Sequence, residues 1–411
     1  MLTPREAARA ILNDVTPLPT EHLPLGECLD RVLAEDVISP LDLPPWNNTA
    51  MDGYAARKAD LAAPGAELSV LEVVHAGRFP TRAVGPGECT RIFTGAPMPE
   101  SADGVIRQED ATPLPGDRVR IDNVRDAGRN VRYRGEDIRG GSLVLSRGTA
   151  LGPAELGVLA SVAAADVPVY RRPRVAFMGS GDEIAELDER DAILSGKKIA
   201  SSNSYTLSGL ITTAGAEPVN LGIAKDDPVD VRRKLTAAAG TDLLVTSAGV
   251  SVGEHDHLRS VFEELGGILA FWRIRMRPGA PVAFGHLGTV PWIGLPGNPV
   301  STMVTFELFV RPVIRRMLGH ALLFRRTVRA RVTESIAIGP PLRHFLRAVV
   351  TEQNGERSAR LTGPQGSGIL TSMVLANALL IVPEDRKQVE AGEVLEAIML
   401  DETVHVGEAP Y

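Results

Sequence analysis

Apolar and polar residues repeat with two different periods along the chain, and each period predicts its own kind of element. Near the start, apolar residues recur at helical spacing over TPREAARAILNDV. Thr3 stands at the N-cap position, Pro4 at the first helical position, and Glu6 completes a capping box. The pattern predicts a short amphipathic helix with one buried face.

The next part of the chain changes to the spacing of β-strands. From about Pro40, short β-like runs such as ELSVLEVVHAG and GECTRIFTGAPMP are interrupted by glycine and proline, as far as RGEDIRGGSLVL. This stretch predicts a β-rich domain of roughly ninety residues. A helix is expected over 152–164, where the chain leads into the following domain.

From Arg172 the chain alternates between strand-like and helix-like segments. Their order is PRVAFMG, SNSYTLSGLITTAG, AEPVNLGIA, PVDVRRKLTAAAG, TDLLVTSAG, HLRSVFEELGG and ILAFWRI. Such alternation predicts a doubly wound, mainly parallel α/β domain. A helix over about 299–318 is followed by β-like segments, with QNGE as a hairpin turn, and these predict a small separate β-domain.

Length, composition and charge narrow the class of protein. A chain of 411 residues predicts more than one core. The net charge of −7 and the absence of basic runs with stacking aromatics argue against nucleic-acid binding. The apolar runs are too short to span a membrane, and the N-terminus lacks a signal-peptide pattern. The two cysteines, Cys28 and Cys89, form no CxxC pattern. These features predict a cytoplasmic protein without a disulfide framework or a zinc site.

Four loops follow predicted strands of the α/β domain, and their residues share a chemistry. They are GSGDE at 179–183, KDDP at 225–228, TSAGVSVGEHDH at 246–257 and IGLPGNPVS at 293–301. Ligands of doubly wound sheets lie at the carboxyl ends of the strands, where unpaired N–H groups attract anions. The carboxylates of Asp182, Glu183, Asp226, Asp227, Glu254 and Asp256 would repel an anion, so a cation is expected between them and a phosphorylated ligand.

Several of these signals have a simpler explanation that stays open at this point. Asp227 before Pro228 is typical of an ordinary helix N-cap. His255 and His257 have no third histidine nearby and fit solvated loop residues. If RIRMR is one strand, the arginines 273, 275 and 277 share a face, which suits either a phosphate or a solvated edge paired with acids. The arginines between 125 and 139 suit an exposed loop or a subunit contact.

Six motifs occur together along the chain. They are NNTAMDGYA, RIFTGAPMP, RGEDI, SGDE, SAGVSVGE and GLPGNPVS. In order and approximate spacing they resemble, over essentially the whole length, the molybdopterin molybdenumtransferase family, known as MoeA in bacteria and as the E domain of gephyrin in animals. The resemblance implies an α/β domain of molybdopterin-binding type, with a β-rich insertion domain, an extended linking region and a small C-terminal β-barrel. It also implies the insertion of molybdate into adenylated molybdopterin, with release of AMP and with Mg²⁺ present.

The resemblance also implies domain limits, site residues and partners. The expected parts are 1–49 with 140–170 as the N-terminal helix and linking region, 50–139 as the β-rich domain, 171–319 as the α/β domain and 320–411 as the barrel. The implied catalytic residues are Asp52, Thr94, Asp137, Glu183, Asp226 and Asp256, of which Glu183, Asp226 and Asp256 would also hold the metal. The implied substrate-binding residues are Ser247, Gly249, Ser251, Gly253, Glu254, Arg273, Arg277, Pro296, Gly297, Asn298, Pro299 and Ser301.

The implied assembly is a homodimer whose cleft joins the α/β domain of one subunit to the β-rich domain of the other. The implied partners are a molybdopterin-adenylating protein and molybdoenzyme or cofactor-maturation proteins.

The chain departs from the family pattern at three positions. Ala280 stands where a lysine is frequent, Ala248 where glycine is usual, and Ser201 where an acid is common. Two other functions are kept beside the enzyme: a non-catalytic pterin carrier or scaffold, and a pterin adenylyltransferase or phosphohydrolase built on the α/β domain. The motifs NNTAMDGYA and RGEDI favour the longer architecture over the last of these.

Overall fold

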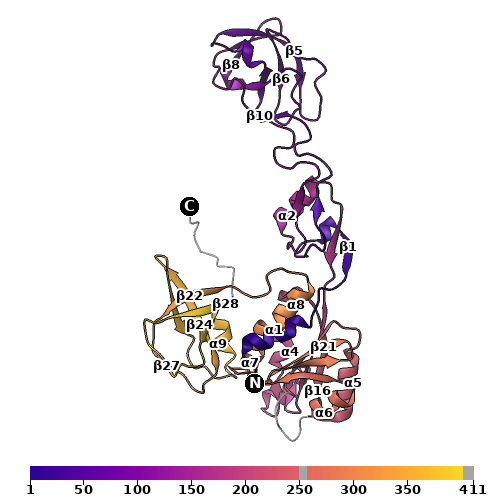
Figure 1. The fold of residues 1–411 in the computed structure, drawn as a ribbon, viewed down its shortest axis with the longest axis vertical. Helices are drawn as coiled ribbons and strands as arrows, with labels where there is room; N and C mark the ends of the chain where they lie inside the picture. The colour runs from indigo at the N-terminus through magenta and orange to yellow at the C-terminus, as the bar shows by residue number, and fades with distance from the viewer. Residues whose placement is uncertain (250–256, 401–411) are drawn as a thin grey trace. The chain divides into compact units, whose positions relative to one another are not determined.

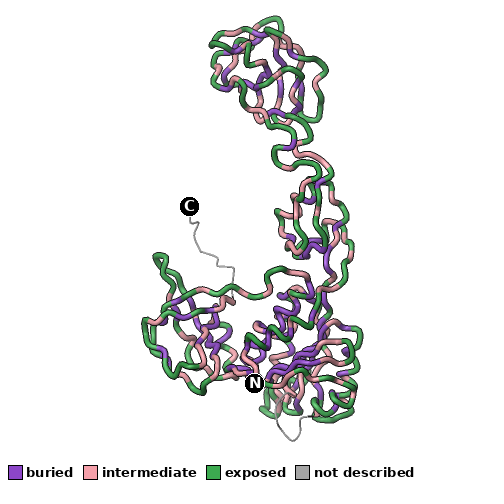
Figure 2. Tube along the Cα trace, in the orientation of Figure 1, coloured by how far each residue is buried: buried purple, intermediate pink, exposed green. Residues whose placement is uncertain are grey.

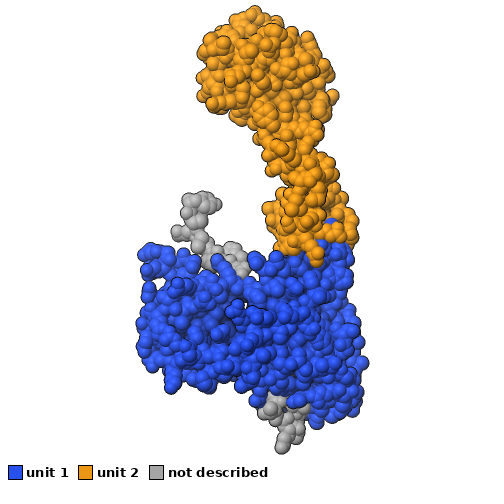
Figure 3. Space-filling model, in the orientation of Figure 1, with its two compact units in different colours: residues 1–21, 30–34, 168–411 blue, residues 22–29, 35–167 orange. Residues whose placement is uncertain are grey.

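The computed structural model describes residues 1–249 and 257–400 (Figure 1). The chain forms two compact units, which Figure 3 shows in two colours. The first unit contains residues 1–21, 30–34 and 168–411, and the second contains 22–29 and 35–167. Within the described residues, no helix is long and apolar enough to cross a membrane.

The first helix, α1, spans Pro4–Asn13 and begins as the sequence predicts. The backbone N–H of Glu6 donates to the Thr3 hydroxyl at 3.3 Å, and the Thr3 N–H donates to the Glu6 carboxylate at 2.8 Å. The predicted capping box is therefore confirmed. Ala7 and Ile11, one helical turn apart, are buried on the face that packs against the α/β domain.

The α/β domain is built on a sheet with the strand order β16-β13-β17-β21-β20-β18. The strands span Glu217–Ala224 (β16), Arg174–Ser180 (β13), Leu243–Ser247 (β17), Val290–Leu295 (β21), Ala283–Leu287 (β20) and Ile268–Trp272 (β18). β16, β13, β17 and β21 pair in parallel, and β20 runs antiparallel to both of its neighbours. The predicted doubly wound, mainly parallel sheet is confirmed.

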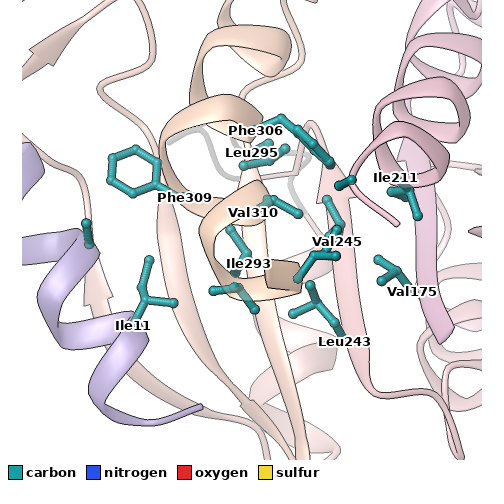
Figure 4. Close-up of a cluster of buried hydrophobic side chains, with 14 of the residues drawn as sticks. Ile11, Val175, Ile211, Leu243, Val245, Ile293, Leu295, Phe306, Phe309 and Val310 are labelled. Atoms are coloured by element: carbon teal, nitrogen blue, oxygen red, sulfur yellow. The ribbon is translucent and has the colours of Figure 1, made fainter. Parts of the chain in front are cut away.

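Helices cover both faces of this sheet because successive strand residues point to opposite sides. They span Ser202–Thr213 (α4), Pro228–Ala237 (α5), His257–Glu264 (α6), Pro299–Thr305 (α7) and Arg311–Met317 (α8), with a π-helical segment at Phe306–Val310 between the last two. On one face, Val245 and Ile293 pack with α1, α4 and the α7–α8 region (Figure 4). On the other face, Leu244 and Trp292 pack with α5 and α6.

The C-terminal domain is a closed barrel. Its strands are β24 (Arg343–Gln353), β25 (Glu356–Leu361), β22 (Thr327–Val332), β28 (Val394–Met399) and β26 (Ala378–Val382), and β26 pairs back with β24 to close the ring. Asn354 and Gly355 both have positive φ, 53° and 80°, between the paired residues Gln353 and Glu356. This is the two-residue hairpin turn predicted at QNGE.

The second unit contains a six-stranded sheet with the order β7-β4-β6-β5-β9-β8. The strands span Gly104–Arg107 (β7), Gly53–Ala56 (β4), Glu88–Ile92 (β6), Ala66–Val74 (β5), Arg118–Ile121 (β9) and Ala111–Leu114 (β8). Cys89 is fully buried in its core, and this burial raises the pKa of the thiol to about 12. The same unit contains the short helix α2 (Pro153–Ser161). Figure 2 shows how far each described residue is buried.

The interpretation of RIRMR as one strand was wrong. β18 ends at Trp272, and Arg273 has φ 72°, a left-handed conformation that turns the chain out of the strand. β19 (Met276–Arg277) then pairs with β24 of the barrel instead. Arg275 forms an ion pair with Glu384 at 2.6 Å. The three arginines therefore do not form a row on one strand.

A buried ion cluster joins the π-helical segment to the chain that leads into the barrel. Both carboxylate oxygens of Glu307 accept from Arg311, at 2.7 and 2.9 Å, and one of them also accepts from Arg325 at 2.7 Å. The side chains of Glu307 and Arg311 are 6% and 9% exposed. Removing the carboxylate would leave two guanidinium groups without their partner in a region of low dielectric.

We predict that Glu307→Ala lowers the free energy of unfolding by about 3–5 kcal/mol. Glu263→Ala is the matched control, because Glu263 pairs with Arg259 at the same helical spacing but on the surface. The control should lose only about 0.3–0.5 kcal/mol. Denaturant unfolding of both variants measures the difference, and equal losses would contradict a special role for the buried cluster.

Candidate functional site

A cavity of about 450 Å³ lies at the carboxyl ends of the central parallel strands. Most of the lining residues belong to four segments of the first unit: the end of β13 with Glu183 and Ile184, residues 199–203 at the start of α4, the end of β17 at 247–249, and the turn 296–299. Pro281 completes the described lining. Glu183 is the one charged residue among the described residues that line the cavity; the others are glycine, alanine, serine, proline, asparagine and isoleucine. Such a wall is suited to a ligand that carries negatively charged oxygens.

The end of β17 has an unusual backbone. Ala248 and Gly249 both have positive φ, 74° and 75°. Glycine adopts this conformation readily, whereas for alanine it costs about 1–2 kcal/mol. The Ala248 N–H donates to the carbonyl of Leu295 at 3.1 Å, so the loop continues the pairing between β17 and β21. Ala248, which stands where the family pattern usually has glycine, therefore places backbone strain at the cavity wall.

The turn 296–299 packs closely against this loop at Gly297. A Cβ on Gly297 would lie 3.1 Å from the Cβ of Ala248. From the other side, the Asn203 side-chain amide donates to the Gly297 carbonyl at 2.8 Å. The Asn298 amide donates to the Ser367 hydroxyl at 3.0 Å. The turn is thus held by contacts with α4 and with the C-terminal domain.

Sequence reasoning did not identify Asn203 or Ser367. Asn203 lies in the first turn of α4, beside the predicted loops, and a polar residue at the start of a helix is the only local signal for it. Ser367 is 69 residues away from its partner Asn298 in the chain. Its carbonyl also accepts from the N–H of Val300 at 3.1 Å. No sequence pattern predicts a contact at this separation.

The acidic residues that sequence analysis grouped together lie in different places. Glu183 lines the cavity, and Gly181 allows this, because a Cβ at Gly181 would lie 2.5 Å from the Glu183 carboxylate. Among the described residues, those that line the cavity do not include Asp226, whose N–H donates to the carboxylate of Asp182 at 3.2 Å. Asp227 accepts from Val229 and Asp230 N–H groups and is the N-cap of α5, as the simpler explanation predicts.

Other expected site residues lie away from the cavity wall or outside the described residues. Arg273 and Arg277 are exposed and are absent from the described residues that line the cavity. Ser301 follows the turn and is buried in α7. Ser251, Gly253, Glu254, His255 and Asp256 lie outside the described residues. In residues 1–249 and 257–400, no group of three or more His, Cys, Asp or Glu side chains could hold a metal ion.

Asp52, Thr94 and Asp137 belong to the second unit. The N–H and the hydroxyl of Thr94 both donate to one carboxylate oxygen of Asp52, at 2.8 and 2.7 Å. These two bonds stabilise the charged form and lower the pKa of Asp52. Asp137 is exposed, and its N–H donates to the Leu43 carbonyl at 3.0 Å. Asp52 therefore stays ionised at a lower pH than an ordinary aspartate.

We predict that Ala248→Gly raises the free energy of unfolding by about 1 kcal/mol, because glycine relieves the left-handed strain. Ala10→Gly, at an exposed position in the interior of α1, should instead lower it by about 0.5–1 kcal/mol. Thermal unfolding of the two variants measures both signs. A loss of stability in Ala248→Gly would show that the loop is not left-handed in solution.

We predict that Thr94→Val raises the pKa of Asp52, because the hydroxyl donor is removed while the backbone donor stays. A lowered native pKa contributes stability above the unfolded value, and this stability is lost as the pH falls through the native pKa. The variant should therefore lose this contribution at a higher pH. Carboxyl ¹³C NMR titration measures the shift. Thr112→Val, which removes the hydroxyl bond to Asp122, should shift Asp122 and leave Asp52 unchanged.

Comparison with known proteins agrees with this architecture along the whole chain. Family models match residues 2–163 (MoeA N-terminal region, domain I and II), 176–316 (probable molybdopterin binding domain) and 329–400 (MoeA C-terminal region, domain IV). The first match covers most of the second unit together with α1, the second lies within the α/β domain, and the third spans the barrel.

Similar proteins cover nearly the full length as well. The chain is 35% identical over 401 residues to the molybdopterin molybdenumtransferase of Haemophilus influenzae. This match covers 96% of the present chain and 98% of the relative. It is 32% identical over 405 residues to the molybdopterin molybdenumtransferase of Bacillus subtilis, and this match covers 97% of the present chain and 94% of the relative. The crystal structure of the molybdopterin biosynthesis MoeA protein from Pyrococcus horikoshii has a TM-score of 0.82 at 30% identity and covers 97% of this chain and 100% of that chain. The chain belongs to the molybdopterin molybdenumtransferase (MoeA) family.

Proposed function

We propose that this protein is a transferase of molybdenum cofactor biosynthesis that inserts molybdate into adenylated molybdopterin and releases AMP. The observation that carries the proposal is the cavity at the strand ends, where Glu183 is the one charged residue among the described residues of a lining rich in glycine, serine, alanine and proline. Both proposed substrates carry tetrahedral oxyanions, the phosphates of the nucleotide and molybdate itself. Backbone N–H groups at loops and helix starts stabilise such oxygens without mobile cationic side chains.

The sulfur chemistry of the reaction belongs to the substrate. Molybdenum is taken up by the dithiolene of the pterin, and soft sulfur ligands suit this metal. The protein does not need a cysteine in the cavity, and Cys28 and Cys89 are both buried in the second unit. The raised pKa of Cys89, about 12, keeps that thiol protonated at neutral pH.

The proposed magnesium ion would be held jointly by a carboxylate of the cavity and by phosphates of the substrate. Mg²⁺ keeps several waters and is held by one or two carboxylates together with substrate phosphates. Glu183 supplies such a carboxylate at the cavity. When bound, the ion would neutralise charge on the phosphoanhydride. We propose Asp226 and Asp256 as further acidic residues of this region, with Arg273 and Arg277 as cations that approach the ligand.

Purified protein should release AMP from adenylated molybdopterin and Mg²⁺ only when molybdate is added. Chromatography of the products measures this. Glu183→Gln keeps the shape of the side chain, removes its charge, and should lower the rate by about 10²-fold or more, since it weakens the electrostatic stabilisation of the reacting phosphate. Asp188→Asn is a control on an exposed carboxylate outside the cavity wall.

Each outcome of this assay separates the candidate functions. Release of AMP without molybdate would indicate a phosphohydrolase, and tight binding without release would indicate a pterin carrier. An unchanged rate in Glu183→Gln would remove the carboxylate from the proposed mechanism while leaving the transferase function in place.

We further propose a homodimer in which Asp52, Thr94 and Asp137 act with the cavity of the partner subunit. This assembly assigns a function to Asp52, which is kept ionised by Thr94. Two inactive variants, Asp52→Ala and Glu183→Ala, should then regain up to about a quarter of the activity when mixed and allowed to exchange subunits, because one site in a hybrid dimer is intact. A fully active monomer in sedimentation, or no recovery on exchange, would contradict the assembly.

We also expect a molybdopterin-adenylating protein to supply the substrate and cofactor-maturation proteins or molybdoenzymes to receive the product.

A further inference from the structure

Asn203 makes an unusual set of contacts at the cavity wall. It lies in the first turn of α4, is half-buried, and lines the cavity. Its amide nitrogen donates to the Gly297 carbonyl at 2.8 Å. A carbonyl only accepts, so the amide nitrogen must face Gly297 and the amide oxygen must face away. That oxygen, Oδ1, is buried and has no hydrogen-bond partner.

Folding stability gives no reason for an asparagine at this position. One neutral hydrogen bond contributes little net stability, and a buried acceptor without a partner loses at least as much. Asn377 of the barrel is a useful contrast. Its amide nitrogen also donates to a carbonyl at 2.8 Å, that of Val350, but its oxygen accepts from the Val350 N–H at 2.7 Å. Asn377 is satisfied at both ends, whereas Asn203 is satisfied only where it contacts Gly297.

The contact that Asn203 makes determines the place of a cavity segment. Gly297 has the Ala248 side chain on one side, where an added Cβ would be 3.1 Å away, and the Asn203 amide on its carbonyl. The neighbouring Asn298 is tied to Ser367. The backbone of the turn 296–299 is therefore held on three sides, and Asn203 is the only one of these contacts that comes from the helix forming the opposite cavity wall.

We propose that Asn203 is a positioning residue of the substrate cavity. By holding the Gly297 carbonyl, it sets the turn 296–299 in the geometry that receives the tetrahedral oxyanion, and it acts through Gly297 without touching the reacting atoms. Its single satisfied bond serves ligand binding rather than the stability of the fold. This inference rests on the proposed function, which assigns that turn to the oxyanion.

The test compares three variants of the full-length protein in the AMP-release assay over a range of molybdate concentrations. Asn203→Ala removes the donor, and Asn203→Asp keeps the shape but sets a carboxylate oxygen against the carbonyl of Gly297. Both should raise the KM for molybdate by about tenfold or more, since a 1 Å misplacement at a reacting centre has effects of this size or larger. Asn203→Ala should keep a Tm within about 2 °C of the wild type, because the lost bond and the lost unpaired acceptor offset each other. Asn203→Asp should lower the Tm, because its carboxylate faces the Gly297 carbonyl, and it therefore serves only for the KM comparison.

Asn377→Ala is the matched control, with the opposite expected result. It should lower the Tm by several degrees and leave the KM for molybdate unchanged. A wild-type KM in Asn203→Ala or in Asn203→Asp would overturn the inference. So would a fall in the Tm of Asn203→Ala as large as that of Asn377→Ala, or failure of Asn203→Ala to fold, because either result would make the role structural. If the wild type releases no AMP with molybdate, the proposed function itself fails, which is a different outcome.

Discussion

The in-register parallel pairing of β17 with β13 and β21 is the constraint on which the rest of the site depends. Ser247, the last residue of β17, lies opposite Gly179 on one side and Leu295 on the other. The three strands therefore end at one level, and the loops that follow them meet at one edge of the sheet. A shift of one residue would turn every side chain of a strand to the other face and separate the loops.

This register is held by burial on both faces of the sheet. Along β17, Val245 points into the core with α1, α4 and α8, and Leu244 points into the core with α5 and α6. Along β21, Ile293 packs in the first of these cores and Trp292 in the second. Because each apolar side chain has only one face on which it is removed from water, the hydrophobic pattern selects the register that also assembles the cavity.

The cavity itself depends on close approaches between elements that are far apart in the chain. The left-handed backbone at Ala248 and the absence of a side chain at Gly297 let two loops touch. Asn203 and Ser367 then hold the turn between them from two different domains of the first unit. A wall made in this way presents backbone groups in fixed directions, which is how preorganised sites stabilise oxyanions.

The sequence by itself determined the features that depend on neighbouring residues. These are the capping box of α1, the N-cap of α5, the QNGE hairpin and the alternation of strands and helices. The sequence also placed Glu183 at the edge of the α/β sheet where the parallel strands end. Only the tertiary structure decided that Arg273 leaves its strand, that Asp226 lies away from the cavity wall formed by the described residues, and that Asn203 and Ser367 hold the turn. The physical reason is that caps, turns and periodicity act over a few residues, whereas these contacts arise when packed elements bring distant residues together.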